Sequence, residues 1–422
     1  MTPKKVIVIG AGAAGMMCAG NAALCGGDVI IIEKNSRVGR KVMITGKGRC
    51  NVTNNCDSSA FIANVPTNGR FLYSAINSFS TQDTMDFFER NGVPLKTERG
   101  NRVFPVSDKA VDIVDALHRF IDQSTCKLIN DEAAALMVKN GAVYGVKTAL
   151  GGKYYCDSVV IATGGKSYPL TGSTGTGYLL AKQAGHTIVE PKPSLVPIVS
   201  SDTWCKELQG LSLRNVSLTV RSKESHREIY KDFGEMLFTH FGVSGPIILS
   251  ASAHLAHKQA DNYYLSVDLK PALTEKQLDA RILRDFEMFI NKDIQNSLNK
   301  LLPSKIIPTV IRKAGIPFET KCNSVTKEQR CALANAIKNF TINIKGFRPI
   351  EEAIVTSGGV STKEINPKTM ESKLCKGLYF AGEVIDADAY TGGFNLQIAF
   401  STGYLAGTSC AYSPYDYQKL SR

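Results

Sequence analysis

The sequence lacks any apolar run long enough to cross a membrane, although 43% of its 422 residues are hydrophobic. A membrane-spanning helix needs about 20 consecutive, mostly apolar residues, and no stretch of this chain approaches that length without interruption. Residues 1–9 lead directly into an apolar strand pattern, unlike a secretory signal peptide. These absences argue against an integral or secreted protein, and we expect a cytoplasmic protein with no membrane partner.

Paired cysteine motifs are also missing. The chain has 11 cysteines, an odd number, with no Cys-x-x-Cys pair and no Cys/His spacing typical of zinc sites. This pattern argues against a disulfide framework and predicts no bound metal. Reduced thiols are expected, and Cys18 and Cys25 are interpreted as small core residues of the first helix.

An excess of acidic residues is the third absence. The 50 Lys and Arg residues outnumber the 38 Asp and Glu residues, which gives a net charge of +12. Residues 1–195 hold 22 basic and 15 acidic residues (+7), residues 196–345 hold 21 and 15 (+6), and residues 346–422 hold 7 and 8 (−1). A basic balance favours an anionic partner such as a nucleic acid. The alternative is a solvated basic surface that aids solubility, and charge alone leaves both interpretations open.

A glycine-rich segment near the amino terminus is the most informative motif that the chain does contain. Residues 10–15 read Gly-Ala-Gly-Ala-Ala-Gly and stand between an apolar strand pattern and an apolar helical stretch. In this dinucleotide-binding pattern, the first glycine permits a tight turn, the second lets backbone amides approach a pyrophosphate, and the third lets the helix pack on the strand. The predicted nucleotide-binding residues here are Gly10, Gly12, Ala13, Ala14 and Gly15.

A second apolar run, residues 29–32, ends at Glu33 and Lys34, which we add to the predicted nucleotide site. The Glu33 carboxylate would accept hydrogen bonds from a ribose diol and repel a 2′-phosphate. The motif therefore predicts a site for FAD or NAD rather than NADP.

The remaining chain suggests an interrupted nucleotide domain. Two further buried-strand patterns, residues 159–162 and 377–381, lead into glycines, and a small-residue helix is expected over 398–411. Residues 196–272 alternate like short strands, whereas Leu278, Ile282 and Phe286 recur at helical spacing. We predict an α/β protein with a doubly wound FAD-binding domain, residues 1–195 and 346–422. A β-rich, barrel-like insert over 196–272 and 340–345 carries a helical subdomain over 273–339.

Several longer motifs carry a family resemblance across nearly the whole chain. They are residues 45–54 (TGKGRCNVTN), 162–169 (ATGGKSYP), 237–246 (LFTHFGVSGP), 356–360 with 369–373, and 381–383 with 391–397. Together they resemble the BaiN/YhiN-like family of FAD-dependent oxidoreductases. The resemblance implies FAD as the main cofactor and a nucleotide domain of the glutathione-reductase type.

The resemblance also directs attention to basic and acidic residues around the flavin. Arg40, Lys41 and Arg49 would supply cations to the diphosphate, and Gly48 would allow close approach of the backbone. Glu383 resembles the acid that contacts the ribityl hydroxyls in such proteins.

Residues 395–397 are predicted to open a helix whose amides and dipole stabilise negative charge on the reduced ring, which favours flavin over NAD. The resemblance places Ala133 and Ala134 beside the adenine. The other predicted cofactor contacts are Gly164, Gly382, Phe394, Asn395, Leu396 and Gln397.

Four residues are candidates for catalysis: His240, Lys166, Tyr168 and Cys50. His240, Lys166 and Tyr168 would face the flavin from the substrate side and donate the proton that completes reduction of a carbon–carbon double bond, and Cys50 would protonate a substrate carbon. The structural alternatives are an internally bonded histidine at a turn and a packed thiol near the pyrophosphate.

The family resemblance implies a reductase that passes a hydride from NAD(P)H through FAD to a carbonyl-activated C=C. Uridine in ribosomal RNA, reduced to dihydrouridine, and a steroid enone of the bile-acid type are the candidate substrates, and the basic charge favours RNA slightly. Only one dinucleotide fingerprint is present, so NAD(P)H is expected to dock transiently. The alternatives are a flavin-dependent amine oxidase of the aminoacetone type and a non-enzymatic RNA-binding flavoprotein.

Overall fold

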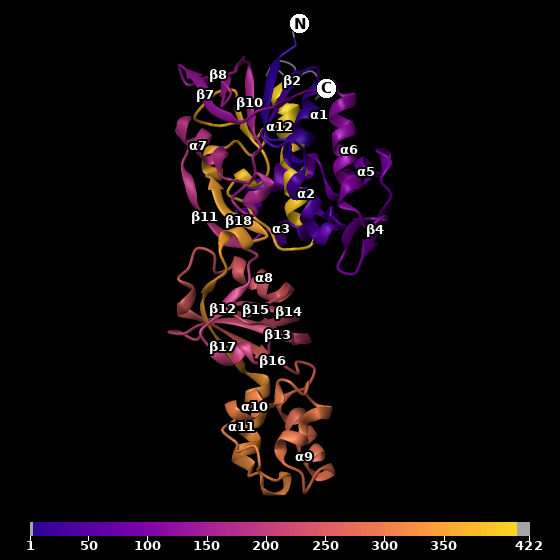
Figure 1. Ribbon diagram of the computed structural model, residues 1–422, viewed down its shortest axis with the longest axis vertical. Coiled ribbons are helices and arrows are strands. Elements are labelled where there is room, and N and C mark those ends of the chain that lie inside the picture. The colour runs from indigo at the N-terminus through magenta and orange to yellow at the C-terminus, as the bar shows by residue number, and fades with distance from the viewer. Residues whose placement is uncertain (1–2, 412–422) are drawn as a thin grey trace. The chain divides into compact units, whose positions relative to one another are not determined.

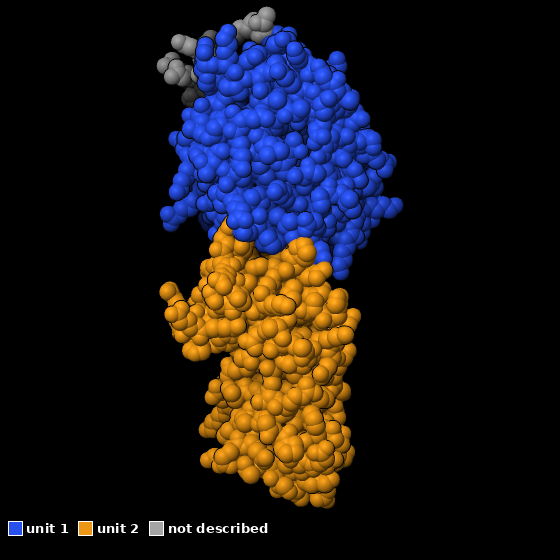
Figure 2. Space-filling model, turned by 60° about the vertical axis from the view of Figure 1, so that its left-hand side comes forward, with its two compact units in different colours: residues 1–194, 350–422 blue, residues 195–349 orange. Residues whose placement is uncertain are grey.

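The computed structural model describes residues 3–411, which divide into two compact units (Figures 1 and 2). Unit 1 comprises Met1–Ser194 and Ile350–Arg422, and unit 2 comprises Leu195–Pro349. The corresponding borders predicted from the sequence lie at 195/196 and 345/346.

A five-stranded sheet forms the centre of unit 1, in the order β19-β10-β1-β2-β6. All its neighbouring strands pair in parallel. Its strands are β1 (Lys5–Ile9), β2 (Asp28–Glu33), β6 (Lys127–Asn130), β10 (Ser158–Ile161) and β19 (Leu378–Phe380). Because β1 and β10 are buried on both faces, their sequences are nearly continuous apolar runs.

Smaller sheets surround this centre. They comprise β3 (Thr53–Asn54), β4 (Leu95–Glu98) and β5 (Arg102–Pro105); β7 (Ala133–Lys139), β8 (Ala142–Thr148) and β9 (Lys153–Tyr155); and β11 (Ile188–Ser194) with β18 (Val355–Val360). The helices are α1 (Ala13–Leu24), α2 (Arg40–Ile44), α3 (Ser58–Ala63), α4 (Tyr73–Ser78), α5 (Thr81–Arg90), α6 (Ala110–Gln123), α7 (Thr176–Gln183) and α12 (Phe394–Ala411).

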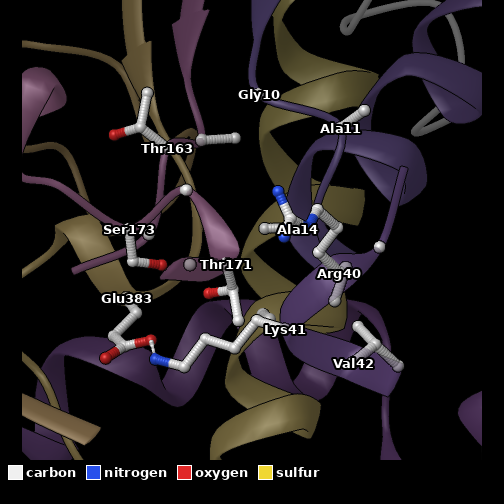
Figure 3. Close-up of a pocket in the computed structure, with 18 of the residues that line it drawn as sticks. Gly10, Ala11, Ala14, Arg40, Lys41, Val42, Thr163, Thr171, Ser173 and Glu383 are labelled. Atoms are coloured by element: carbon white, nitrogen blue, oxygen red, sulfur yellow. Dashed lines mark hydrogen bonds and ion pairs between the residues drawn. The ribbon is translucent and has the colours of Figure 1, made fainter. Parts of the chain in front are cut away.

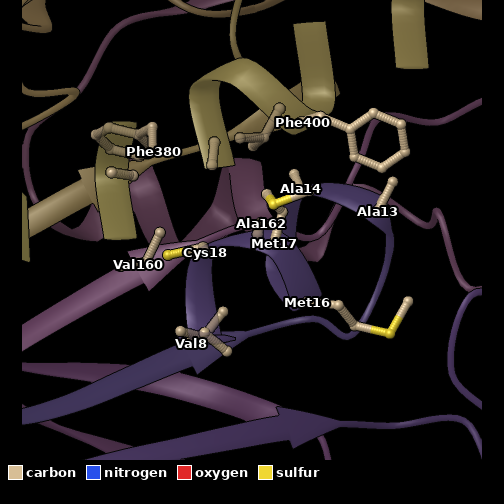
Figure 4. Packing of buried hydrophobic residues seen from close by; sticks show 14 of the residues in the cluster. Val8, Ala13, Ala14, Met16, Met17, Cys18, Val160, Ala162, Phe380 and Phe400 are labelled. Carbon is tan, nitrogen blue, oxygen red and sulfur yellow. The ribbon is translucent and has the colours of Figure 1, made fainter. Parts of the chain in front are cut away.

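Helices α1 and α12 form the core of unit 1 together with the central sheet (Figure 4). Nine of the twelve residues of α1 are buried, so the helix lacks a polar face. Glycines of α12 allow its close approach, because an added Cβ at Gly403 would lie 2.5 Å from the carbonyl oxygen of Ala14, and one at Gly407 would lie 2.3 Å from that of Cys18. Residue numbers rise together along both helices, so α1 and α12 run parallel.

Unit 2 contains a closed antiparallel barrel, in the order β12-β15-β14-β13-β16-β17. Its elements are β12 (Ile198–Ser200), β13 (Ser212–Ser222), β14 (Glu228–Thr239), β15 (Gly242–Ser244), α8 (Pro246–Ala253), β16 (Tyr263–Asp268), α9 (Glu275–Met288), α10 (Ile307–Lys313), α11 (Lys327–Lys338) and β17 (Phe340–Phe347). Helices α9, α10 and α11 form a helical subdomain between β16 and β17 (Figure 1).

The predicted α/β class with a barrel-like insert is confirmed. One local prediction was wrong: Cys25 is the residue after α1 rather than inside it. The stretch 196–272, which alternates like short strands, also contains helix α8, which begins at Pro246, a residue favoured in a first helical turn.

No helix between residues 3 and 411 has the length and apolar character that a membrane span requires.

The contact between α1 and α12 generates the first testable prediction. Gly403→Ala gains up to about 1 kcal/mol of helix propensity, but its methyl group would meet backbone that cannot rotate away. We expect a net destabilisation of about 1–3 kcal/mol, typical of overpacking. Urea unfolding measures it. Thr408→Ala, at a half-buried position of the same helix, is the control, and equal stability of the Gly403 variant and the wild type would contradict the close-packing argument.

Candidate functional site

A large cavity opens in unit 1 where the carboxyl ends of β1, β2, β10 and β19 meet (Figure 3). It leaves about 1330 Å³ of space, its open mouth included. Because parallel strands end at the same edge of the sheet, segments that lie far apart in the sequence contribute to one wall. Its lining includes Gly10–Ala14, Glu33–Asn35, Arg37, Gly39–Val42, Asp131–Ala133, Ala162–Gly164, Thr171–Ser173, Gly382, Glu383, Asn395 and Leu396.

The three fingerprint glycines have the separate roles that the motif predicts. Gly10 has a φ of 101°, and an added Cβ would lie 2.7 Å from the carbonyl oxygen of Ala162. A Cβ at Gly15 would lie 1.8 Å from the carbonyl oxygen of Gly10, so glycine at this position allows the helix to pack directly on the preceding turn. At Gly12 a Cβ would have no neighbour within 4 Å and would project into open space. Gly12 therefore leaves room for a ligand, whereas Gly10 and Gly15 allow the fold.

The amino terminus of α1 has no side-chain cap. Its N-cap is Gly12, no side chain accepts a hydrogen bond from its first amides, and its first turn contains no acid. In contrast, the capping residues Ser80, Thr274 and Thr326 satisfy the first turns of α5, α9 and α11. Unsatisfied amides and the positive end of the dipole make the start of α1 a ready anion site.

Glu33 is buried at the end of β2 and organises the glycine-rich loop. Its Oε2 accepts a hydrogen bond from the Ala11 amide at 2.7 Å, and its Oε1 accepts from the backbone and side-chain nitrogens of Asn35 at 2.8 and 2.7 Å. Three of the roughly four acceptor positions of a carboxylate are thus occupied. The predicted ribose contact would use the remaining position and stays a prediction.

Lys41 is paired with Glu383, an interaction that the sequence motifs did not reveal (Figure 3). The Lys41 ammonium donates to Glu383 Oε2 and to Ser167 Oγ, each at 2.6 Å. Glu383 Oε1 accepts from Ser167 Oγ at 3.0 Å and from the Thr356 amide at 2.9 Å. The network joins four distant segments. It also neutralises the charge of Lys41, so Lys41 does not offer a free cation to a diphosphate as predicted.

Two other guanidinium groups at the cavity are better placed for that role. Arg37 and Arg40 are exposed and line the cavity, and no carboxylate within the described residues lies at ion-pair distance from either. Arg40 donates to Asn35 Oδ1 at 2.9 Å. Lys34, by contrast, is paired with Glu132 at 3.3 Å. Arg37 was not predicted, because it lies outside the glycine-containing segments and is not next to the acidic residue Glu33.

Helix α12 also points its amino terminus toward the cavity, where Asn395 and Leu396 line the wall. Ala14 is the second residue of α1, and its contact Gly403 is the tenth residue of α12. Because nine residues of α12 precede this contact and only one residue of α1 does, the amino terminus of α12 extends about 12 Å farther than that of α1. Two electropositive helix ends, offset along one cavity, suit an elongated ligand with negative charge at two places.

Neither Phe394 nor Gln397, both predicted cofactor contacts, lines this cavity. The Phe394 ring packs edge-on against Phe61. The Gln397 side chain is fully buried, where it accepts from Thr53 Oγ1 at 2.6 Å and donates to the backbone oxygens of Phe79 and Ser80 at 3.1 Å. The position of Gln397 in the first turn was predicted correctly, but a helix also directs some first-turn side chains into the core.

The structure also separates Gly48, Arg49 and Ala134 from the cavity lining. The Arg49 guanidinium forms ion pairs with Glu98 and Asp108 and lies 4.2 Å from the centre of the Phe104 ring. These two ion pairs neutralise the positive charge of Arg49. Ala133 lines the cavity, whereas the side chain of Ala134 is exposed, because successive strand residues point to opposite faces. Gly164 lies at the cavity as predicted.

The four predicted catalytic residues are absent from the lining of the unit 1 cavity. Lys166 is exposed, and Tyr168 is half-buried in a left-handed conformation with a φ of 52°. Cys50 is fully buried, and burial raises the pKa of its thiol to about 12. His240 belongs to unit 2, in the turn between β14 and β15, with its ring 4.9 Å from that of Phe241. Their catalytic roles stay predictions.

The residues of the cavity fit a diphosphate-bridged dinucleotide. The uncapped start of α1, the open space above Gly12 and the exposed Arg37 and Arg40 provide for a diphosphate. The start of α12 provides positive potential for a ring that becomes anionic. Groups of three or more His, Cys, Asp or Glu side chains that could hold a metal ion do not occur among residues 3–411.

Comparisons with known proteins give a consistent result. The family described as "HI0933-like protein Rossmann domain" matches residues 4–409. The chain is 30% identical to a 3-dehydro-bile acid delta(4,6)-reductase of Clostridium scindens, over 97% of this chain and 100% of that protein. It is also 30% identical to a ribosomal RNA dihydrouridine synthase of Haemophilus influenzae, over 96% of this chain and 97% of that protein.

Solved structures share the fold at lower identity. A 3-ketosteroid-delta4-(5alpha)-dehydrogenase from Rhodococcus jostii RHA1 superposes with a TM-score of 0.54 at 13% identity, covering 97% of each chain.

The contrasting glycines predict different outcomes for two similar substitutions. Gly12→Ala should fold with a melting temperature near that of the wild type, because its methyl group meets nothing, yet lose at least 10-fold in dinucleotide affinity, or about 1.4 kcal/mol. Gly15→Ala should be destabilised, because the methyl group overlaps the Gly10 carbonyl. Thermal unfolding and equilibrium dialysis with FAD separate the two effects. Unchanged FAD affinity in folded Gly12→Ala would place the diphosphate elsewhere.

The thiols predict a distinct pattern of alkylation. Cys331 is exposed and Cys50 is buried, with a pKa raised to about 12, so at pH 8 Cys50 stays in the unreactive thiol form. Only a rise in pH toward 12 would produce its thiolate. Mass spectrometry after brief iodoacetamide treatment should find Cys331 modified and Cys50 unmodified until urea is added. Equal labelling of both cysteines in the folded protein would contradict this assignment.

Proposed function

The chain belongs to the HI0933-like family of FAD-dependent oxidoreductases, and from this premise we propose that it is a reductase that uses NAD(P)H to reduce a carbonyl-activated carbon–carbon double bond. We propose uridine in ribosomal RNA as the substrate, slightly ahead of a steroid enone. The family model and the two relatives confirm the predicted resemblance to the BaiN/YhiN-like family.

The observation that carries the proposal is the pair of offset helix ends in one cavity. When bound, FAD would supply a ring that can accept a hydride from NAD(P)H and pass it to a carbon–carbon double bond. The α1 amides with Arg37 and Arg40 would hold its diphosphate, and Glu33 the ribose of its adenosine. The start of α12 would stabilise the negative charge that two-electron reduction adds.

The identity to both kinds of relative is the same, 30%, so sequence similarity alone does not choose between uridine and a steroid enone. Both substrates present a double bond conjugated to a carbonyl group. The net charge of +12 supports the polyanionic substrate. Substrate reduction also requires a proton, for which His240, Lys166 and Tyr168 remain proposed donors. We do not assign this role to Cys50, because its thiol has no exposed surface.

We also propose that unit 1 is the FAD-binding domain, as its sequence predicts, and that unit 2 contributes to substrate recognition. The single glycine-rich fingerprint supports transient rather than permanent binding of NAD(P)H.

Anaerobic titration of the FAD-loaded protein tests the proposal. NADH or NADPH should bleach the flavin absorbance, and unmodified ribosomal RNA should then restore it with the appearance of dihydrouridine, detected in nuclease digests by mass spectrometry. A steroid enone added in parallel should restore the absorbance more slowly. The folded Gly12→Ala variant, whose dinucleotide affinity is expected to be at least 10-fold lower, is the control for dependence on bound FAD.

Other outcomes of the titration identify the competing functions. Bleaching by a small amine without NAD(P)H would select an amine oxidase. Rapid reoxidation by the enone with no effect of RNA would select the steroid substrate. A flavin that no donor reduces would leave a non-enzymatic RNA-binding flavoprotein.

A further inference from the structure

The charge of unit 2 is concentrated in its helical subdomain. Residues 273–339 contain twelve Lys and Arg and seven Asp and Glu, a net charge of +5. The barrel segments, residues 195–272 and 340–349, contain ten and eight, a net charge of +2. The smaller part of unit 2 therefore holds most of its excess charge.

Ion pairs within this subdomain neutralise equal numbers of acids and cations and leave its net charge unchanged. Asp279 is paired with Arg330, Asp285 with Arg281 at 3.0 Å, and Asp293 with Lys321 at 2.7 Å. Asp285 is almost completely buried. These pairs use three of the twelve cations and three of the seven acids, so nine cations and four acids of the subdomain lie outside them.

Two such cations lie beside one aromatic ring at the end of α9, and a third is exposed on the same helix. The Lys292 ammonium lies 4.8 Å and the Lys300 ammonium 5.5 Å from the centre of the Phe289 ring. Arg284 is exposed one turn earlier on α9. Among the residues that the structure describes, no carboxylate is at ion-pair distance from these three cations.

Apolar and amide groups complete this region. Met288 is 56% exposed and Ile290 is 52% exposed, although both flank Phe289 in the sequence. Two contacts hold Lys300 in place. Arg281 donates a hydrogen bond to its backbone oxygen at 3.2 Å, and its ammonium group lies 3.0 Å from the Met288 sulfur. The Phe289 surface is defined here as Arg284, Met288, Phe289, Ile290, Lys292 and Lys300.

We propose that the Phe289 surface binds a single-stranded segment of RNA. Two ammonium groups gathered on one ring provide for adjacent phosphates, and the exposed apolar side chains provide contacts for unstacked bases. Exposed amides at Asn291, Asn296 and Asn299 add hydrogen-bonding groups that base edges require and that a lipid surface does not. The inference rests on the proposed function, since it gives an RNA substrate a docking surface on the helical subdomain of unit 2.

The salt dependence of RNA binding tests this proposal with matched variants. A fluorescein-labelled oligouridylate of about 12 nucleotides is suitable, because a single-stranded site covers roughly 4–16 nucleotides. Lys292→Gln/Lys300→Gln should reduce the slope of log Kobs against log salt by about 1.4, since each phosphate that is no longer neutralised lowers the slope by about 0.7. Lys223→Gln/Lys258→Gln removes the same charge from the barrel, including an ammonium 5.7 Å from the Tyr263 ring, and should leave the slope unchanged.

Melting temperature and flavin content establish that both double variants are folded. A second test is Arg284→Gln, a single change at an exposed position, which should reduce the slope by about 0.7. An unchanged slope in Lys292→Gln/Lys300→Gln, or an equal decrease in both double variants, would overturn the proposal. Binding to phosphatidylserine vesicles without binding to the oligouridylate would also overturn it and identify a membrane surface.

This test is separate from the test of the proposed function. If the surface is wrong but the function is right, the Lys292→Gln/Lys300→Gln variant will form dihydrouridine at the wild-type rate. If the function is wrong but the surface is right, the slope will change although no protein forms dihydrouridine.

Discussion

The site in unit 1 depends on how closely two helices approach each other. Gly403 and Gly407 place no side chain between α12 and the carbonyl oxygens of Ala14 and Cys18, so the two helices pack closely at these positions. This contact fixes the register of α12 and therefore the position of its amino terminus along the cavity. A slip by one turn would move that terminus by about 5.4 Å, which would separate Asn395 and Leu396 from the wall that they now form.

Electrostatic compensation differs between the cavity and the remaining surface. Capping boxes complete α5, α9 and α11, whereas the start of α1 is left open. Lys41 and Lys34 are neutralised by acids within the wall, and the exposed Arg37 and Arg40 are not. An anionic ligand therefore meets a few defined donors rather than a general positive field, which favours one orientation of an asymmetric molecule.

Local motifs predicted what depends on local geometry. The glycine fingerprint, Glu33 and the parallel strands followed from spacing, because each turn and contact involves neighbouring residues or adjacent strands. The pairing of Lys41 with Glu383 could not be predicted, since it joins residues 342 positions apart. Arg49 and Gln397 were assigned to the cofactor from their positions beside glycines and at a helix start, but side-chain direction decides such contacts, and both point toward internal partners. Helix α8 was missed because its eight residues are nearly all small or apolar and resemble a buried strand.

The order of the helices along the chain has a consequence for biosynthesis. Helix α1 is made first, and the helix that covers it, α12, is made last, after all of unit 2. On the ribosome, unit 2 has its complete sequence and can fold while α1 still awaits its partner. A nascent chain of this protein would therefore expose the apolar face of α1 that α12 covers until α12 has been synthesised, so the connectivity favours early binding by a chaperone and late loading of the cofactor.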